Sequence, residues 1–167
     1  MATTKRAYKI GDKVFCPPHG VGEICCKREE KVGGNPIDVY EISILHSELR
    51  VMVPVALTDT QGLRPVSDKK LIDKVLRTLK EKKGKSVETQ TWNRRQREYT
   101  QKIKTGCLLE MAEVYRDLSV LSSGKELSFG EKKMLDQVEE LLVTEISIAK
   151  SRPRDKVSSE LSALFCH

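Results

Sequence analysis

Alternating apolar and polar positions fill the first part of the chain and predict short β-strands. In the clearest run, Tyr40, Ile42 and Ile44 alternate with polar residues, as expected for a sheet with one face inward and one face in water. The predicted strands are Tyr8–Ile10, Lys13–Cys16, Val21–Cys26, Val39–Leu45 and Leu49–Val55. About five strands in about sixty residues indicate a small closed or nearly closed barrel, because closure removes exposed strand edges.

After Val66 the apolar positions change to helical spacing. Leu71–Leu79, behind a Ser67–Asp68 start, predicts an amphipathic helix that ends in a linker at Lys82–Ser86. A second helix is predicted with Trp92, Gln96, Tyr99 and Ile103 on one face and Gly106 as its stop.

Three further helices follow in the same half of the chain. The third is predicted from Leu108 to Leu118 and ends by Gly124. Ser128 and Glu131 have the spacing of a capping box, which predicts the start of the fourth. Pro153 precedes a short last helix.

These patterns predict an α+β fold with two domains. Residues 1–66 form a small N-terminal β-barrel of Tudor or SH3 type, and residues 67–167 form a compact C-terminal bundle of about five helices. The barrel type rests on Gly11-Asp12-x-Val14 followed by His19-Gly20-x-Gly22-x-Ile24, in which an acidic turn starts a strand and a glycine pair allows a tight bend. Such barrels mostly serve as docking surfaces for protein or nucleic acid.

The positive charge lies almost entirely in the second half. Residues 1–66 hold nine Lys/Arg against eight Asp/Glu, whereas residues 67–167 hold 21 against 16. Between Lys69 and Lys104 thirteen basic residues face four acidic ones, although much of this excess falls on Lys69–Lys85, which is interpreted equally well as a solvated helix and linker.

Chemistry-bearing motifs are absent from the sequence. The histidines lie in no His-Glu-x-x-His motif, and neither Gly-x-Ser-x-Gly nor Gly-x-x-x-x-Gly-Lys occurs, so we expect no enzyme. Cys16-Pro17-Pro18-His19 with Cys25 or Cys26 is the best metal candidate, but a second well-spaced ligand pair is missing. We interpret these residues as small buried thiols and a turn histidine, and expect neither metal nor cofactor.

The composition also predicts the compartment. The five cysteines do not form the even, spaced pattern of a secreted disulfide scaffold, and no apolar segment has the length of a membrane span. A cytoplasmic, monomeric protein without a membrane partner is expected.

Trp92 stands in the segment Thr91-Trp92-Asn93-Arg94-Arg95-Gln96-Arg97 at the start of a predicted helix. Its spacing to Tyr99 and Ile103 fits a core residue. The three arginines favour the alternative, in which an aromatic wedge enters DNA while neighbouring cations neutralise phosphates. Lys132 and Lys133, at the start of the capped helix, are either solvated or part of a phosphate site.

The order of the motifs resembles the CarD/CdnL family of bacterial RNA polymerase-binding regulators over nearly the whole chain. The carriers are Tyr8–Val14, Pro18–Gly22, Val51–Val55, Gly62–Arg64, Trp92–Arg95, Ala112–Leu118 and Leu127–Leu135. Each is weak by itself, but together they are specific.

The resemblance implies a Tudor-like barrel on the β subunit of RNA polymerase, similar to the module of transcription-repair coupling factors, and a helical domain on promoter DNA. Trp92 would be a minor-groove wedge at the upstream edge of the transcription bubble and would stabilise the open complex, largely without sequence preference. The implied DNA contacts are Trp92, Arg94, Arg95, Arg97, Lys132 and Lys133. The protein would be associated with the nucleoid through the polymerase.

The polymerase contact departs from the family pattern at one position. Some relatives carry Arg where this chain has Met52. Arg50, on the same strand face, and Arg28, in the preceding hairpin, are the alternative cations. The predicted polymerase contacts are therefore Arg28, Arg50, Val51 and Met52. Leu49–Val55 is either an edge strand that pairs with a strand of the partner or an ordinary paired core strand.

Two other functions remain open at this point. A Tudor-type reader or RNA-binding module independent of polymerase would need aromatic residues clustered on the barrel, which supplies only Tyr8, Phe15 and Tyr40. A zinc-dependent redox protein would need bound metal.

Overall fold

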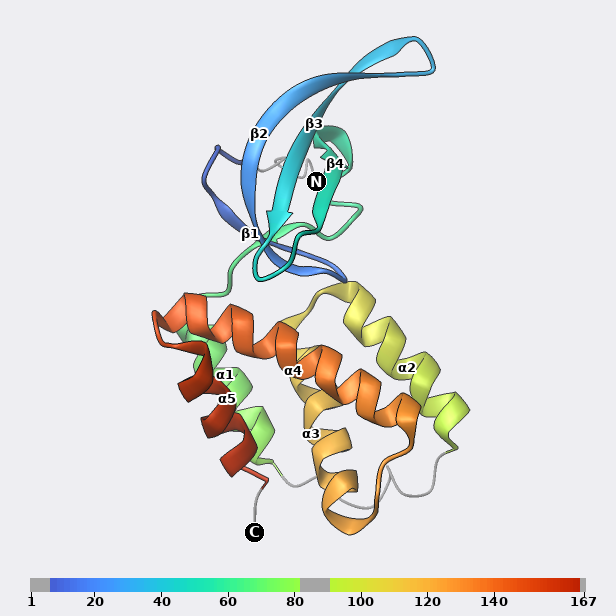
Figure 1. The fold of residues 1–167 in the computed structure, drawn as a ribbon, viewed down its shortest axis with the longest axis vertical. Coiled ribbons are helices and arrows are strands. Elements are labelled where there is room, and N and C mark those ends of the chain that lie inside the picture. Colours follow the sequence, from blue (N-terminus) through green and yellow to red (C-terminus); the bar gives the residue numbers. More distant parts are fainter. Residues whose placement is uncertain (1–6, 82–90, 166–167) are drawn as a thin grey trace, which may run out of the picture. The chain divides into compact units, whose positions relative to one another are not determined.

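The computed structural model describes residues 7–81 and 91–165, so the predicted linker at Lys82–Ser86 lies outside the described residues. The chain divides into two compact units, Met1–Val66 and Ser67–His167. Figure 1 shows the first as a sheet and the second as helices. The predicted α+β architecture, with a barrel-like sheet followed by five helices, is confirmed.

The first unit is a five-stranded antiparallel sheet in the order β4-β3-β2-β1-β5. The strands are β1 (Lys13–Cys16), β2 (Gly20–Val32), β3 (Asn35–Ile44), β4 (Arg50–Pro54) and β5 (Arg64–Pro65), and a 3-10 turn, η1 (Val55–Leu57), follows β4. The inward positions of the strands form its core, because Val14, Ile42 and Val53 are completely buried. The alternation read from the sequence therefore gives the correct inner face.

Gly22 permits the closest approach within this sheet. A Cβ atom at Gly22 would lie 2.5 Å from Cγ2 of Ile42 and 2.9 Å from the backbone oxygen of Ser43. Any side chain there would push β2 away from β3, which explains the second glycine of the predicted bend.

The sheet differs from the prediction at its ends. Tyr8–Ile10 is not a strand; the Tyr8 ring packs edge-on against Tyr40, with ring centroids 6.0 Å apart, and its hydroxyl donates to the Leu63 carbonyl at 3.2 Å. The short β5 was not predicted. The β2–β3 hairpin also extends further than predicted, since β2 continues to Val32 and carries a register irregularity between Ile24 and Cys26.

The described part of the second unit, residues 67–81 and 91–165, contains five helices. They are α1 (Lys69–Lys80), α2 (Trp92–Thr105), α3 (Leu108–Gly124), α4 (Phe129–Lys150) and α5 (Arg154–Ala163). Met111 and Leu118 of α3 are fully buried, as are Val138 and Leu142 of α4. In the described parts of the chain, no helix combines the length and apolar character that crossing a bilayer requires.

Local sequence signals set the helix boundaries. The side chain of Asp68 accepts from the Leu71 amide at 2.8 Å and caps α1. Gly106 ends α2 in the left-handed region, at φ 72°. Ser128 and Glu131 form both halves of the predicted capping box of α4. These caps satisfy amide groups that a helix end would otherwise leave without a partner.

A buried carboxylate ties the first residue of this unit to the longest helix. Glu145 of α4 is completely buried and accepts hydrogen bonds from the amide of Ser67 at 3.0 Å and from its hydroxyl at 2.8 Å. These bonds compensate the carboxylate for lost water. The start of the helical unit is therefore fixed on α4.

Candidate nucleic-acid and polymerase interfaces

Trp92 begins α2 and lies half-buried at its N-terminus. Thr91 caps the helix by accepting from the Arg94 amide at 3.4 Å. The guanidinium carbon of Arg95 lies 5.5 Å from the centre of the indole, within the range of a cation–π contact. The helix start therefore holds a partly exposed indole with the Arg95 guanidinium beside its ring.

Arg95 is itself almost completely buried, with 4% of its surface exposed. Its Nη1 lies 3.6 Å from Oε2 of Glu131 in α4. Burial raises the pKa of the neighbouring Tyr99 to about 12, partly offset by the charge of Arg95, so the phenol stays neutral. The predicted contact of Arg95 with the DNA backbone stays a prediction, and in this structure the guanidinium is buried beside Glu131.

The predicted face of α2 needs one correction. The spacing predicts Gln96 on one face with Trp92, Tyr99 and Ile103. Gln96 is exposed, however, and Arg95 is buried with Tyr99 and Ile103. Both residues fit a helical stripe below Trp92, because neighbours three and four residues apart share a face. The ion pair with Glu131 explains why Arg95, and not Gln96, is buried.

The Glu131 carboxylate takes part in two interactions at the start of α4, a helix cap and an ion pair. Its Oε1 accepts from the Ser128 hydroxyl at 2.9 Å as part of the capping box, while Oε2 faces Arg95. The neighbouring Gly130 lies against the indole, since a Cβ atom there would be 3.3 Å from Nε1 of Trp92. The N-termini of α2 and α4 therefore meet around Trp92, and we call Trp92, Arg95, Gly130 and Glu131 the tryptophan bracket.

Exposed cations surround the tryptophan bracket. Arg94 is exposed on α2, and Lys132 and Lys133 are exposed on the first turn of α4. Lys132 pairs with Glu126 at 3.3 Å, with exposed fractions of 55% and 87%. Such exposed pairs contribute little and leave the lysine free to exchange partners. Arg97 lies further along α2 in an open depression.

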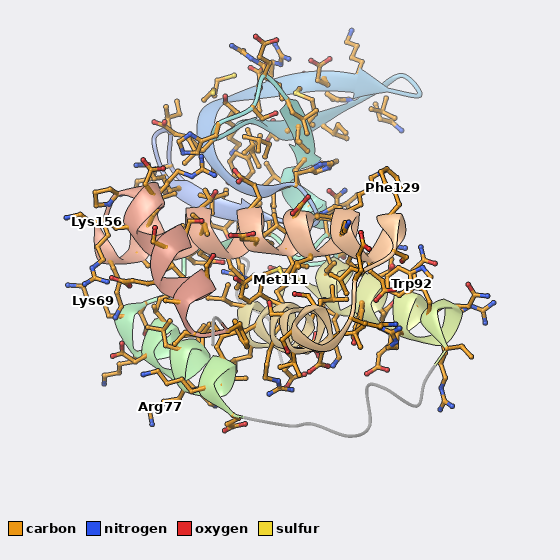
Figure 2. All side chains as sticks on the ribbon, turned by 60° about the horizontal axis from the view of Figure 1, so that its bottom comes forward. Lys69, Arg77, Trp92, Met111, Phe129 and Lys156 are labelled. Carbon is orange, nitrogen blue, oxygen red and sulfur yellow. The ribbon has the colours of Figure 1, made fainter. Side chains whose placement is uncertain are left out.

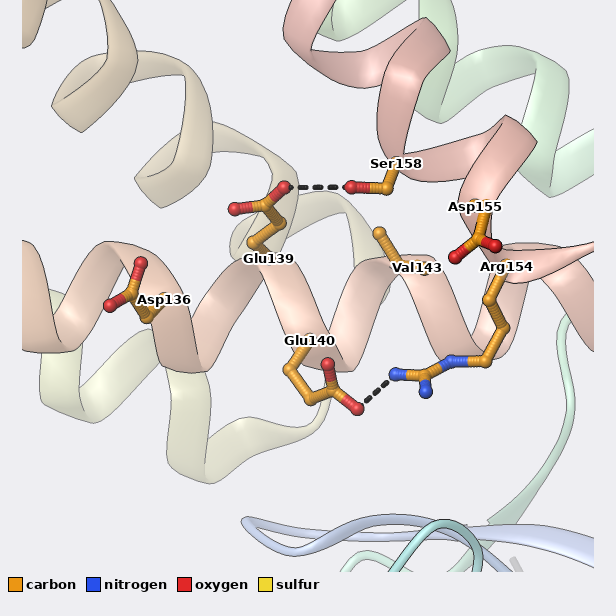
Figure 3. Close-up of a pocket in the computed structure, with 7 residues that line it drawn as sticks. All are labelled: Asp136, Glu139, Glu140, Val143, Arg154, Asp155 and Ser158. Atoms are coloured by element: carbon orange, nitrogen blue, oxygen red, sulfur yellow. Dashed lines mark hydrogen bonds and ion pairs between the residues drawn. The ribbon is translucent and has the colours of Figure 1, made fainter.

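A pocket between α4 and α5 has the opposite charge. Its lining includes Asp136, Glu139, Glu140 and Asp155 (Figure 3). Within it Arg154 pairs with Glu140, and the Ser158 hydroxyl donates to Glu139 at 3.2 Å. The surplus of carboxylates makes this part of α4 unfavourable for a phosphate group.

Three of the predicted polymerase residues, Arg28, Arg50 and Met52, lie together on one face of the sheet unit, whereas Val51 packs against its core. Met52 pairs with Glu41 and Arg50 with Ser43 in the β3–β4 register. The carboxylate of Glu41 lies 3.3 Å from Arg50 Nη1 and 3.7 Å from Arg28 Nη2. Arg28 Nη2 is also 3.6 Å from the Met52 sulfur. Glu41, which the sequence did not single out, therefore links both arginines.

The edge of β4 is open in the described structure. The strand order ends at β4, whose described pairing is with β3 alone. Met52 has 38% of its surface exposed, and Val51 is partly buried. Of the two readings of this strand, an edge able to pair with a partner strand fits the topology.

Cys26 adds a thiol to the same face. Its Sγ donates to Oε2 of Glu41 at 3.1 Å. The hydrogen bond from Cys26, followed by that from Arg50, lowers the pKa of Glu41, and the same bond to Glu41 raises the pKa of Cys26. The carboxylate therefore stays ionised between the arginines while the thiol stays protonated.

The metal candidate is not assembled. Cys16 is buried, and desolvation raises its pKa to about 11, whereas Cys25 and His19 are exposed. Within residues 7–81 and 91–165, no group of three or more His, Cys, Asp or Glu side chains could hold a metal ion. A zinc-dependent function has no support in this geometry.

The barrel aromatics do not form a reader cage either. Phe15 and Tyr40 are buried in the core, and Arg64 covers the Phe15 ring at 4.4 Å. Tyr8 packs against Tyr40. A cage for a methylated ligand needs several open aromatic faces, which these residues do not present.

The two units match two different family models. Residues 8–67 match the CarD-like/TRCF RID domain, and residues 74–162 match the CarD C-terminal domain. The chain is also similar to "Putative transcription factor YdeB" of Bacillus subtilis (strain 168), with 32% identity over 152 residues that cover 91% of this chain and 98% of the relative.

Proposed function

Because the chain belongs to the CarD family of transcription regulators, whose N-terminal module is related to RNA polymerase interaction, we propose that it stabilises the promoter open complex. In this proposal residues 1–66 bind the β subunit of the polymerase. Residues 67–167 contact DNA at the upstream edge of the bubble. The observation that supports the DNA contact most is the partly exposed indole of Trp92, which lies where the starts of α2 and α4 meet and where exposed cations follow in both helices.

Trp92 acts as the wedge. Its indole enters the minor groove or a base step that melting has loosened, while Arg94, Lys132 and Lys133 neutralise the flanking phosphates. Arg95 keeps the indole in place from behind, and Arg97 reaches the DNA backbone further along α2. Only a difference in affinity can move the equilibrium, so the wedge stabilises the open complex by binding loosened DNA better than closed duplex.

The polymerase contact uses the open edge of β4. A strand of the β subunit pairs with β4 through backbone hydrogen bonds, and the side chains beside the edge choose the partner. Arg28, Arg50, Val51 and Met52 supply those side chains. The two arginines, held by Glu41, give a directed positive charge for an acidic neighbour on the polymerase.

We expect a steep salt dependence for DNA binding, with a smaller slope in the Lys132→Ala variant. Removing one phosphate contact lowers the slope of log K against log salt concentration by about 1. The affinity of the full-length protein for promoter DNA, measured at several salt concentrations, checks this. Lys156→Ala, an exposed lysine on α5, is the matched control and should keep the wild-type slope. An unchanged slope in Lys132→Ala would remove Lys132 from the interface.

We expect Arg50→Glu and Met52→Glu to weaken retention of RNA polymerase by the immobilised full-length protein at least about tenfold. Each introduces a negative charge beside Glu41, and an uncompensated like charge at an interface costs several kcal/mol. Leu57→Ala, an exposed apolar residue of η1, is the control. Retention of the β subunit by both charged variants at the wild-type level would contradict a contact at β4.

A further inference from the structure

Phe129 is the most exposed large apolar side chain in the described structure. It is the first residue of α4, and 84% of its surface is open to solvent. The chain has only one Trp, four Tyr and three Phe, and all lie in the described parts. Among them Phe129 is the only one that is exposed, and the others are buried or partly buried. Helix formation does not require an aromatic residue at this position, where many residue types are accepted.

Its location makes this exposure informative. Phe129 directly precedes Gly130, whose backbone lies against the Trp92 indole. Figure 2 shows Phe129 projecting from the first turn of α4 and Trp92 at the start of α2. The exposed ring therefore lies at the start of α4, one residue before the glycine whose backbone lies against the Trp92 indole.

The charges around Phe129 indicate the kind of ligand. Lys132 and Lys133 follow it by three and four residues, and helix periodicity places such neighbours on the same face. Both lysines are exposed, and within residues 7–81 and 91–165 the ion-pair partner of Lys132 is the exposed Glu126. One further turn along, Asp136 belongs to the acidic pocket and ends the positive region. An aromatic ring with two cations on one short helical turn fits a nucleotide, whose base presents a flat face and whose phosphate is anionic.

We propose that Phe129 is a second aromatic DNA contact, which stacks on a base that is unpaired in melted DNA, next to the position of Trp92. Paired bases in a duplex are already stacked on both sides and do not offer a free face, whereas an unpaired base does. Lys132 and Lys133 bind the adjoining phosphates in both forms. Phe129 consequently adds selectivity for melted DNA, and the lysines add affinity without selectivity. This inference rests on the proposed DNA contact of the helical unit.

The test compares two DNA molecules of the same sequence, a full duplex and a fork with one unpaired strand at the junction. Affinities of the full-length protein are measured by fluorescence anisotropy of labelled DNA at low salt. Phe129→Ala should lower the affinity for the fork about tenfold and leave the affinity for the duplex within about twofold. Phe129→Leu, which keeps an apolar side chain without a ring face, should lose most of the same selectivity. Lys133→Ala should weaken both affinities by similar factors.

Because Phe129 is highly exposed, its replacement should not disturb the fold, and circular dichroism of each variant checks this. Ile10→Ala, an apolar residue of the other unit with 71% exposure, is the matched control and should bind both DNA molecules as the wild type does. Equal losses of affinity for fork and duplex, or no loss of affinity in Phe129→Ala, would overturn the stacking contact. If Trp92→Ala still weakens fork binding in that case, the proposed DNA contact of the helical unit stands. A wild-type protein that binds neither DNA molecule would overturn the proposed DNA contact as well.

Discussion

Replacing Trp92 with alanine is expected to shorten the lifetime of the promoter open complex about tenfold, which corresponds to about 1.4 kcal/mol. Stacking or wedging of one aromatic ring on DNA contributes about 1 to 3 kcal/mol, so a tenfold loss is a conservative value. The effect falls on the open complex because the wedge binds loosened DNA better than closed duplex. The measurement is the decay of polymerase–promoter complexes after a competitor challenge, with wild type and variant at saturating concentration.

The same substitution should leave the fold nearly unchanged. Trp92 is half-buried at the first position of its helix, and the Arg95–Glu131 ion pair behind it does not depend on the indole. Loss of the partly covered ring should lower the free energy of unfolding by about 1 kcal/mol. A loss of about 3 kcal/mol or more would instead identify Trp92 as a core residue.

Two further variants test whether the effect on the open-complex lifetime depends on the Trp92 indole and its position. Gln96→Ala changes an exposed, uncharged residue one turn along α2 and should keep the wild-type lifetime. Gly130→Ala keeps the indole but places a methyl group 3.3 Å from its Nε1, so the ring must move by a few tenths of an ångström. An intermediate lifetime of the open complex is expected for Gly130→Ala. A wild-type lifetime in Trp92→Ala would refute the role of Trp92 as a wedge.

The elements that the sequence predicted well are those with local causes. Asp68, Ser128 and Gly106 act on the helix ends next to them, through caps that involve only a few neighbouring residues. The inner face of β3 is equally local, because the alternation of Tyr40, Ile42 and Ile44 follows from strand geometry. For such features the short-range pattern and the final packing agree.

The sheet features that were missed depend on distant partners. The outer part of the β2–β3 hairpin, around Lys27–Val32, is exposed, so it lacks the apolar alternation that marks a strand. It is held by its register with β3 instead. β5 contains only Arg64 and Pro65 and is recognisable only through its pairing with Phe15 and Val14. Two residues with a proline carry no strand signal of their own.

The contacts around Trp92 could be predicted from the sequence only in part, and the functional roles of the site residues stay predictions. The motif places Trp92 and the arginines at the start of α2, but periodicity alone could not choose between Arg95 and Gln96 for the buried position. The choice depends on Glu131, which the sequence marked only as a cap. The capping box was the available signal, since it fixes where the carboxylate of Glu131 lies relative to the start of α4.

Breaking the Arg95–Glu131 pair is expected to cause the largest loss of stability. Arg95→Met and Glu131→Gln should each lower the free energy of unfolding by about 3 to 5 kcal/mol, because each leaves the other charge buried without its partner. Both side chains are only 5% exposed, which prevents water from replacing the lost partner. Urea unfolding followed by circular dichroism measures the change. Arg152→Ala is the control, since the Arg152–Glu160 pair is about half exposed and should contribute less than about 1 kcal/mol.

The double variant Arg95→Met with Glu131→Gln should be more stable than the sum of the single losses predicts. It removes both charges, and glutamine keeps an oxygen that can accept from Ser128, so the capping box survives. For groups in direct contact a coupling energy of about 1 to 3 kcal/mol is expected. Strict additivity would mean that the two side chains do not form an ion pair in solution.

The double variant also separates stability from positioning. With its fold restored, the protein still lacks the guanidinium that lies over the Trp92 indole, so the ring is no longer held from behind. The open-complex lifetime should therefore stay several-fold below the wild-type value, because an aromatic group that must be ordered on binding contributes less than one that is already in place. Full recovery of the lifetime together with the stability would show that Arg95 only supports the fold. A persistent loss in a stable protein would make Arg95 the residue that positions Trp92 for DNA.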